Sequence, residues 1–374
     1  MLVTASLTLL SLAFSAVLAL SGVGSPLAVA HLAFAVGIVP LIFAAMSHFV
    51  PVLTRTGNPS PVIAQVPRLA QLAGVVAVLA MQGIIPRWLV SLAAAVDLVL
   101  AGILLNWIVG RARATLGSPH PGWRWYSFAL GCLMLALLAA IFIDIWPAYW
   151  KPLRLFHLHL NTIGLVGLAA LGTLPVLMPT ALGKPDPDAA GWLRRRVWLV
   201  TSGALIVATG AAIVWEFAVP GAALVLVAAL GLLGQWSRRF GIMVILKDGV
   251  SASLFVAMLG LLMTMVAGVA HGAGFAPGRP DLLAWGIAFL LPLVSGALSQ
   301  LLPVWRWPGP VIPARLEMRK ILAKNGQWRS GLWLSSAGAV LAGYDLLAGV
   351  LLAIGLLLFM FSLLQAVRLP RSTR

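Results

Sequence analysis

Apolar runs of about 20 residues recur along the whole chain, and short segments that contain most of the charged residues separate them. An α-helix needs about 20 predominantly apolar residues to cross the hydrocarbon core of a bilayer. The pattern therefore predicts an all-α membrane protein with twelve transmembrane helices, near residues 2–20, 31–53, 68–86, 88–110, 126–147, 156–179, 197–216, 219–236, 250–270, 283–304, 330–345 and 348–367.

Composition agrees with this interpretation and excludes several classes of protein. Of the 374 residues, 61% are hydrophobic and only 9% are charged, whereas soluble domains contain about 25% charged residues. The single cysteine, Cys132, excludes a disulfide framework and a cysteine-rich zinc site. The net charge of +16 comes from basic residues between apolar runs, so no nucleic-acid partner is expected and the partner is the lipid bilayer.

The distribution of basic residues predicts the orientation. Cytoplasmic loops are enriched in Lys and Arg, and an N-terminus inside the cell leaves only Arg87, Lys151, Arg154 and Arg279 of the 25 Lys and Arg residues outside. Both termini are then cytoplasmic, and the protein belongs in the inner membrane of a bacterial-type cell. The longest connection, 305–329, is interpreted as a cytoplasmic loop, and the first run as a span rather than a cleaved signal peptide.

Spans two, six and ten share a pattern that ends in a proline at the inner surface. His31 lies twenty residues before Pro51, His159 lies twenty before Pro179, and Leu283 occupies the matching place before Pro303. The pattern predicts one transmembrane domain, 1–374, made of three four-helix repeats at about 1–124, 125–247 and 248–374. The alternative is coincidence, because Gly and Pro are frequent in membrane helices.

Four of the six histidines fall on the outer side, at the ends of spans two, six and nine: His31, His157, His159 and His271. Ionisable residues inside a membrane are expensive and usually functional. His157 and His159 point to opposite sides of their helix, because two residues turn about 200°. The matched pair His31 and His159 is therefore the candidate for binding a haem iron from both faces. The alternative is that these imidazoles only bond neighbouring carbonyls.

Further residues extend this hypothesis. His157 and His271 are candidates for a second haem or a copper ion, so the metal-ligating candidates are His31, His159, His157 and His271. The outer cations Arg87, Lys151, Arg154 and Arg279 are candidates for pairing with haem propionates, or they only keep the outer loops soluble. Asp97 lies near the middle of span four and is a proton-relay candidate, or a neutral acid bonded to a neighbouring helix.

Span six, with His157-Leu-His159 followed by glycines and a terminal proline, resembles the His-x-His helix of the haem–copper oxidase superfamily. Span two, with His31, Pro40 and Phe49-Val-Pro51, is similar to the helix that carries the other low-spin haem ligand. The resemblance implies a twelve-helix catalytic-subunit fold in three arcs, with His31 and His159 as the low-spin pair and His157 facing a second centre. The His-led second helix also resembles the NnrS-like haem and copper proteins linked to nitric oxide stress.

The departures from these families limit the activity that is expected. The His-x-His helix is the tenth in the oxidases and the sixth here, and the chain lacks the tyrosine and the His-His pair of the oxidase copper site. It also lacks the paired histidines of the NnrS-like group. We therefore expect a divergent haem-binding protein, with haem b near the outer surface and copper as a second candidate, rather than an oxygen reductase. Its role is electron transfer, or sensing or handling of nitric oxide or oxygen, with a redox protein or a respiratory-complex subunit as partner. The alternative is a haem-free carrier, a copper-handling protein or an assembly partner.

Overall fold

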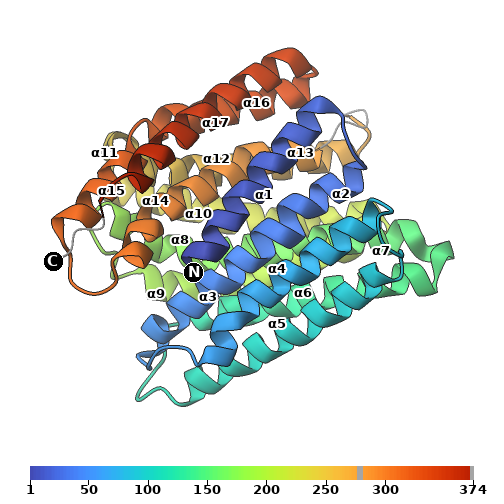
Figure 1. The fold of residues 1–374 in the computed structure, drawn as a ribbon, viewed down its shortest axis with the longest axis horizontal. Coiled ribbons are helices and arrows are strands. Elements are labelled where there is room, and N and C mark those ends of the chain that lie inside the picture. The colour runs from blue at the N-terminus through green and yellow to red at the C-terminus, as the bar shows by residue number, and fades with distance from the viewer. Residues whose placement is uncertain (276–280, 371–374) are drawn as a thin grey trace. The chain divides into compact units, whose positions relative to one another are not determined.

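The computed structural model describes residues 1–275 and 281–370, and every regular element within these ranges is helical (Figure 1). The elements of the first half of the chain are α1 (Leu2–Ser21), α2 (Pro26–His31), η1 (Leu32–Ile38), α3 (Val39–Thr54), α4 (Pro61–Met81), α5 (Leu89–Arg113), α6 (Gly122–Ile145), η2 (Pro147–Tyr149), α7 (Trp150–His159), η3 (Leu160–Gly167) and α8 (Leu168–Ala181). Those of the second half are α9 (Ala189–Ile213), η4 (Trp215–Phe217), α10 (Ala218–Phe240), α11 (Ile242–Lys247), α12 (Gly249–Gly272), α13 (Asp281–Trp285), η5 (Gly286–Leu290), α14 (Leu291–Arg306), α15 (Pro313–Ala323), α16 (Gly326–Ala342) and α17 (Asp345–Val367).

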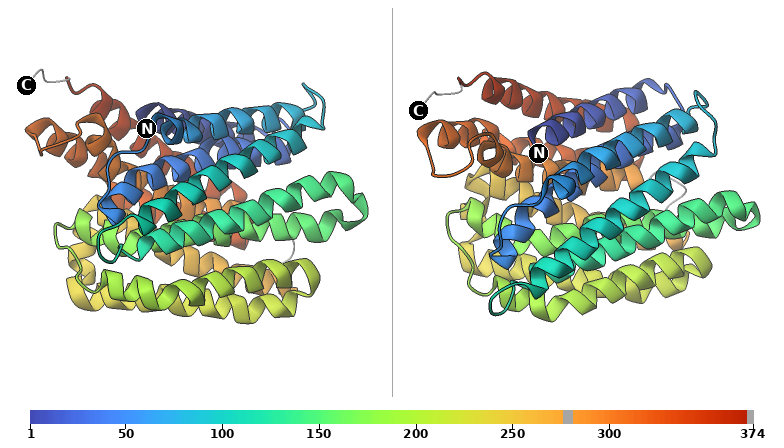
Figure 2. Two further views of the ribbon diagram at one scale, coloured as in Figure 1. Left: turned by 90° about the horizontal axis from the view of Figure 1, so that it is seen from below. Right: turned by 60° about the horizontal axis from the view of Figure 1, so that its bottom comes forward.

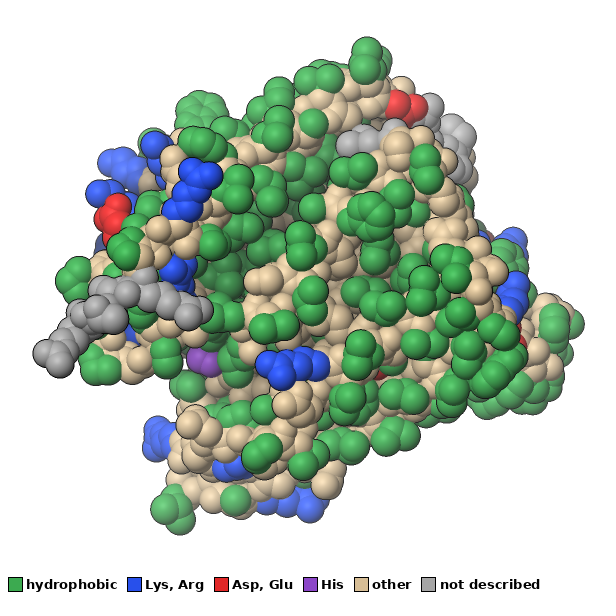
Figure 3. All heavy atoms as spheres, viewed as in Figure 1, with side chains coloured by type: hydrophobic (Ala, Val, Ile, Leu, Met, Phe, Trp, Pro, Cys, Tyr) green, Lys and Arg blue, Asp and Glu red, His purple; other side chains and the backbone are tan. Residues whose placement is uncertain are grey.

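Eleven helical stretches in the described residues are long and apolar enough to cross a membrane. This finding confirms the prediction of a multi-pass α-helical membrane protein. The predicted span 330–345 falls on α16, which has 17 residues and is shorter than any of the eleven. Hydrophobic side chains cover most of the face drawn in Figure 3, as expected for a surface in contact with lipid.

Three of the long stretches contain a π-helical segment, in which hydrogen bonds connect residues five apart. The segments η1, η3 and η5 interrupt the second, sixth and tenth predicted spans. Well under 1% of residues in proteins are π-helical, and such segments often mark functional sites. Two of them begin directly after a histidine, because η1 follows His31 and η3 follows His159.

Neighbouring helices supply hydrogen bonds to the carbonyl groups of η1. Thr8 of α1 donates its hydroxyl to the Gly37 carbonyl at 2.9 Å, and Gln71 of α4 donates its amide to the Val36 carbonyl at 2.9 Å. α4 can lie this close because Gly74 has no side chain: a Cβ atom at this position would overlap the carbonyl group of Ala35. The irregular backbone of η1 is thus held by specific partners inside the protein, as the absence of water in a bilayer requires.

The chain divides into two compact units, and each is described by itself. The first contains residues 1–172 and 190–221, and the second contains 173–189 and 222–374. In the first unit, α5 packs against both α4 and α6, and α6 also packs against α7 and η3. In both views of Figure 2, the hairpin formed by α6 and α7 can be traced beside α5.

A polar cluster in the second unit connects several helix ends at the predicted cytoplasmic side. Arg319 of α15 donates to the Gln300 side chain at 2.7 Å and to the Ala181 carbonyl at 2.6 Å, and its Nη2 lies 3.2 Å from Oδ1 of Asp248. Asp248 also caps α12 by accepting a hydrogen bond from the Ser251 amide at 2.9 Å. The segment 305–329, interpreted from the sequence as a cytoplasmic connection, contains the amphipathic helix α15, with Met318 buried and Lys320 exposed.

Candidate functional site

Two histidines that are far apart in the sequence lie close together in the first unit. His31, the last residue of α2, and His157 of α7 have ring centroids 6.2 Å apart, and the ring planes differ by 19°. The structure therefore brings together two of the residues that the sequence singled out as ligands.

The hydrogen bonds of the imidazoles determine which ring nitrogen is available. Nδ1 of His31 lies 2.8 Å from the carbonyl oxygen of Leu27, and Nδ1 of His157 lies 2.8 Å from the carbonyl oxygen of Ala136 on α6. A carbonyl oxygen only accepts hydrogen bonds, so each Nδ1 atom donates and each Nε2 atom of the neutral ring retains a lone pair. Histidines that ligate metals commonly have this arrangement, in which a backbone carbonyl fixes the ring.

His159 belongs to the opposite side of α7. Its Nδ1 donates to the Leu155 carbonyl at 2.8 Å, within its own helix. The sequence paired His31 with His159, whereas the ring contact in the structure joins His31 to His157. Residues at equivalent positions of a repeat point the same way relative to their own helices, so equivalence alone does not make two side chains face each other.

Asn161 was not singled out by the sequence and lies beside the pair. It is the second residue of η3, and its side-chain Nδ2 donates to the His157 carbonyl at 2.8 Å. The same nitrogen lies 3.4 Å from Nε2 of His157. The signal that could have identified Asn161 is its spacing, because a residue four positions after a helical histidine lies on the same face.

Positions along α6 show how far the His157 contact lies from the C-terminal end of this helix. Asp144, near the C-terminal end of α6, accepts a hydrogen bond from Ser91 at the start of α5. His157 contacts Ala136, eight residues earlier on α6, which corresponds to about 12 Å along the helix axis. The contact of His157 thus lies about two turns from the end of α6 that Asp144 marks.

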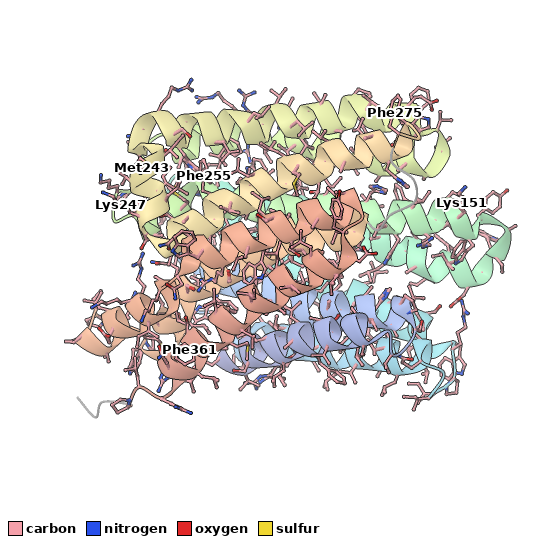
Figure 4. The ribbon with its side chains drawn as sticks, turned by 90° about the horizontal axis from the view of Figure 1, so that it is seen from above. Lys151, Met243, Lys247, Phe255, Phe275 and Phe361 are labelled. Carbon is pink, nitrogen blue, oxygen red and sulfur yellow. The ribbon has the colours of Figure 1, made fainter. Side chains whose placement is uncertain are left out.

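The cations proposed as propionate partners differ in their surroundings. Arg87 lies 3.8 Å from Asp144, and the Arg154 guanidinium lies 5.1 Å from the centroid of the Trp150 ring. Lys151 is exposed at the start of α7 (Figure 4). Arg279 lies outside the described residues. Of the three described cations, Arg154 is closest to the pair along the chain, one turn before His157 on the same face of α7.

The remaining metal-ligand candidate belongs to the second unit. His271 is exposed near the C-terminal end of α12. Within residues 1–275 and 281–370, no group of three or more His, Cys, Asp or Glu side chains is arranged to hold a metal ion. The ring pair found in the first unit consists of the two imidazoles of His31 and His157.

Asp97 is buried in the first unit, on the face of α5 that packs against α4. Its exposed fraction is 7%, and its Oδ1 atom has no hydrogen-bond partner among the described residues. One turn earlier, Ala93 packs against Ala73 and Ala77 of α4. An ionised carboxylate without a partner is strongly disfavoured in such surroundings. The carboxyl group of Asp97 is therefore expected to be neutral.

Infrared spectroscopy of the detergent-purified protein tests the charge of Asp97. We expect the carbonyl-stretch band of a protonated carboxylic acid near neutral pH, because no described group stabilises the anion. Asp97→Asn should remove this band, and Asp97→Glu should shift it. A protonated-acid band of equal intensity in the wild-type protein and in Asp97→Asn would contradict the assignment, as would the absence of such a band from the wild-type protein.

No protein-family model matches this chain, and no curated protein matches its sequence significantly.

Proposed function

We propose that this protein binds a b-type haem between His31 and His157 in the membrane. Its function is electron transfer, or the sensing or handling of nitric oxide or oxygen, in a divergent oxidase-like scaffold. The single observation that carries the proposal is the pair of imidazoles, each held by a backbone carbonyl through Nδ1, with ring centroids 6.2 Å apart. The bound haem would supply an iron that takes up one electron or binds a small gas.

The separation of the two rings supports an iron between them. Two imidazoles on opposite sides of one metal have ring centroids about 6 Å apart, because each nitrogen lies about 2 Å from the metal and roughly 1 Å from the centre of its ring. The observed 6.2 Å agrees with this value. The two ring planes are nearly parallel, with an interplanar angle of 19°.

In this proposal, the residues around His31 and His157 have different roles. Leu27 and Ala136 orient the rings and favour the tautomer in which Nε2 is the ligand. Arg154, one turn outward from His157, provides a positive charge for a propionate, and Trp150 holds its guanidinium by a cation–π contact. Lys151 and Arg87 add positive charge further outward.

The proposed architecture is one of twelve spans in three four-helix repeats, with both termini in the cytoplasm of a bacterial-type cell. The positions of the π-helical segments support the repeat. Leu32 and Leu160, which begin η1 and η3, each lie nineteen residues before the proline that ends the pattern. η5 lies in the corresponding part of the third repeat, and Pro40 and Pro292 both follow the end of their π segment by two residues.

The test is an oxidised-minus-reduced optical spectrum of the purified protein beside three alanine variants. We expect a sharp reduced α-band that is lost in His31→Ala and His157→Ala and retained in His159→Ala. Retention in His157→Ala with loss in His159→Ala would instead support the pairing inferred from the sequence. A folded wild-type protein without any haem band would overturn the proposal, and metal analysis would then distinguish copper handling from a carrier or assembly role.

A further inference from the structure

We propose that α11 is a membrane-surface anchor that binds anionic phospholipids at one face of the second unit. Its apolar side chains insert between the lipids at the level of the glycerol groups, and Arg238 and Lys247 bind the phosphates of the adjacent headgroups. This inference concerns residues outside the histidine pair and does not depend on the proposed haem.

The position of α11 in the chain places it at a membrane surface. It connects α10 with α12, and both helices belong to stretches that are long and apolar enough to cross a membrane. The last turn of α10 contains Arg238 and Arg239, and such charged side chains are strongly disfavoured in the hydrocarbon core. Because α11 follows this pair directly, it lies where the polar headgroups begin.

Three consecutive side chains of α11 are both apolar and exposed. They are Ile242, Met243 and Val244, and the exposed fraction of Met243 is 70%. Contact between water and such side chains is unfavourable, and an exposed apolar patch at the end of a membrane span marks a surface that lipid or protein covers. Short helical segments with an apolar face and flanking cations insert that face between lipids.

A glycine turn and several hydrogen bonds fix the orientation of α11. Gly241, with φ of 80°, adopts the left-handed conformation that glycine favours and separates α11 from α10. The Ile245 side chain is fully buried, and its carbonyl accepts a hydrogen bond from the Ser251 hydroxyl at 2.7 Å. Asp248, which follows α11, is held by Arg319. The apolar face is therefore ordered before lipid binds, which lowers the entropic cost of binding.

The charges around α11 leave two cations for lipid phosphates. Arg239 pairs with Asp186 at 2.8 Å and with Asp188 at 2.6 Å. Arg238 and Lys247 are exposed on either side of α11, and no acidic side chain in the described part of the chain pairs with either of them. Figure 4 shows Met243 and Lys247 close to each other on α11. Long cationic side chains beside an apolar surface extend towards the headgroups, so this arrangement favours an anionic lipid.

The experiment places a fluorophore at position 243 of the full-length protein. Met243→Cys is labelled with nitrobenzoxadiazole in a background that lacks the buried Cys132, as Cys132→Ala, and is reconstituted into nanodiscs with one copy each. The discs contain phosphatidylcholine or phosphatidylglycerol with a spin label near the glycerol end of an acyl chain. We expect blue-shifted emission that both lipids quench. Phosphatidylglycerol should quench at a lower mole fraction, by roughly fivefold for each cation that binds it.

Two sets of variants control for position and for charge. Lys184→Cys, labelled in the same background, lies in the exposed loop between α8 and α9 and should emit as in water, without quenching. Arg238→Gln combined with Lys247→Gln should remove the preference for phosphatidylglycerol and leave the quenching by phosphatidylcholine unchanged. Lys151→Gln, in the first unit, also removes a positive charge and should retain the preference.

Each of the following results would overturn the inference. Emission from position 243 that equals that of the Lys184→Cys control would mean that water covers α11. Blue-shifted emission that neither lipid quenches would mean that protein covers it. Equal quenching by the two lipids, or a preference for phosphatidylglycerol that persists after both cations are replaced, would mean that Arg238 and Lys247 do not bind the headgroups.

Discussion

Replacing Gly74 by alanine should destabilise the first unit by roughly 3 kcal/mol, the upper range for an added methyl group that the surroundings cannot accommodate. The new Cβ atom would meet the backbone of Ala35 and Val36 rather than a side chain that can rotate away. α4 must then move off η1, and Gln71 loses its hydrogen bond to the Val36 carbonyl. Because η1 follows His31 directly, the haem that we propose at His31 should be lost together with the stability.

The measurement is the midpoint of thermal unfolding followed by tryptophan fluorescence, together with the haem content of the purified variant. Gly131→Ala is the matched control: Gly131 lies within α6 of the same unit, and a Cβ atom there would meet nothing within 4 Å. This control should be neutral or slightly stabilising, since alanine favours helix. If Gly74→Ala and Gly131→Ala unfold at the same temperature, the close packing of α4 on η1 does not support the site.

Arg329→Ala should have a comparable effect in the second unit. The Arg329 side chain is fully buried. It donates to the Leu322 carbonyl at 2.9 Å and to the Ser299 hydroxyl at 3.2 Å, and its guanidinium lies 4.9 Å from the centroid of the Phe359 ring. Alanine leaves the last turn of α15 without its charged donor and creates a cavity beside Phe359. We expect the free energy of unfolding to fall by about 3 kcal/mol.

Arg329→Met separates the two contributions, because methionine fills most of the volume and lacks the donors. We expect its stability to lie between those of the wild-type protein and Arg329→Ala in denaturant titrations of the detergent-solubilised protein. Lys324→Met, at an exposed position just after α15, is the control for loss of a basic residue and should be neutral. An Arg329→Met variant as stable as the wild-type protein would show that the charge contributes nothing and that only the packing matters.

The positions of the helices could be predicted from the sequence because lipid requires long apolar segments. The predicted span 250–270 corresponds to α12, Gly249–Gly272, and the predicted span 88–110 corresponds to α5, Leu89–Arg113. α15 was not predicted because it is short, with 11 residues, and has no long apolar run. Its pattern of buried Met318 and Leu322 with polar residues between them was present in the sequence, but it lay in a segment rich in proline.

The π-helical segments could not be predicted, because their stability comes from other helices. Nothing in the sequence of η1 indicates that Thr8 and Gln71 will bond two of its carbonyls. The histidines of the candidate site could be predicted from the sequence, because four histidines fall at predicted outer helix ends in a chain with few charged residues. Which imidazole faces His31 depends on how α7 is rotated against α6, and the bond from His157 to the Ala136 carbonyl, which fixes this rotation, joins residues 21 positions apart.

The two rings of the candidate site are also oriented at different stages of synthesis. His31 takes its orientation from Leu27, four residues earlier in the same helical stretch, so this ring can be positioned as soon as its own helix forms. His157 takes its orientation from Ala136, which leaves the ribosome earlier and belongs to the preceding helix. The growing chain thus presents one half of the site first and completes it when the hairpin of α6 and α7 closes. The proposed haem site would therefore be assembled in order, with His31 positioned before His157.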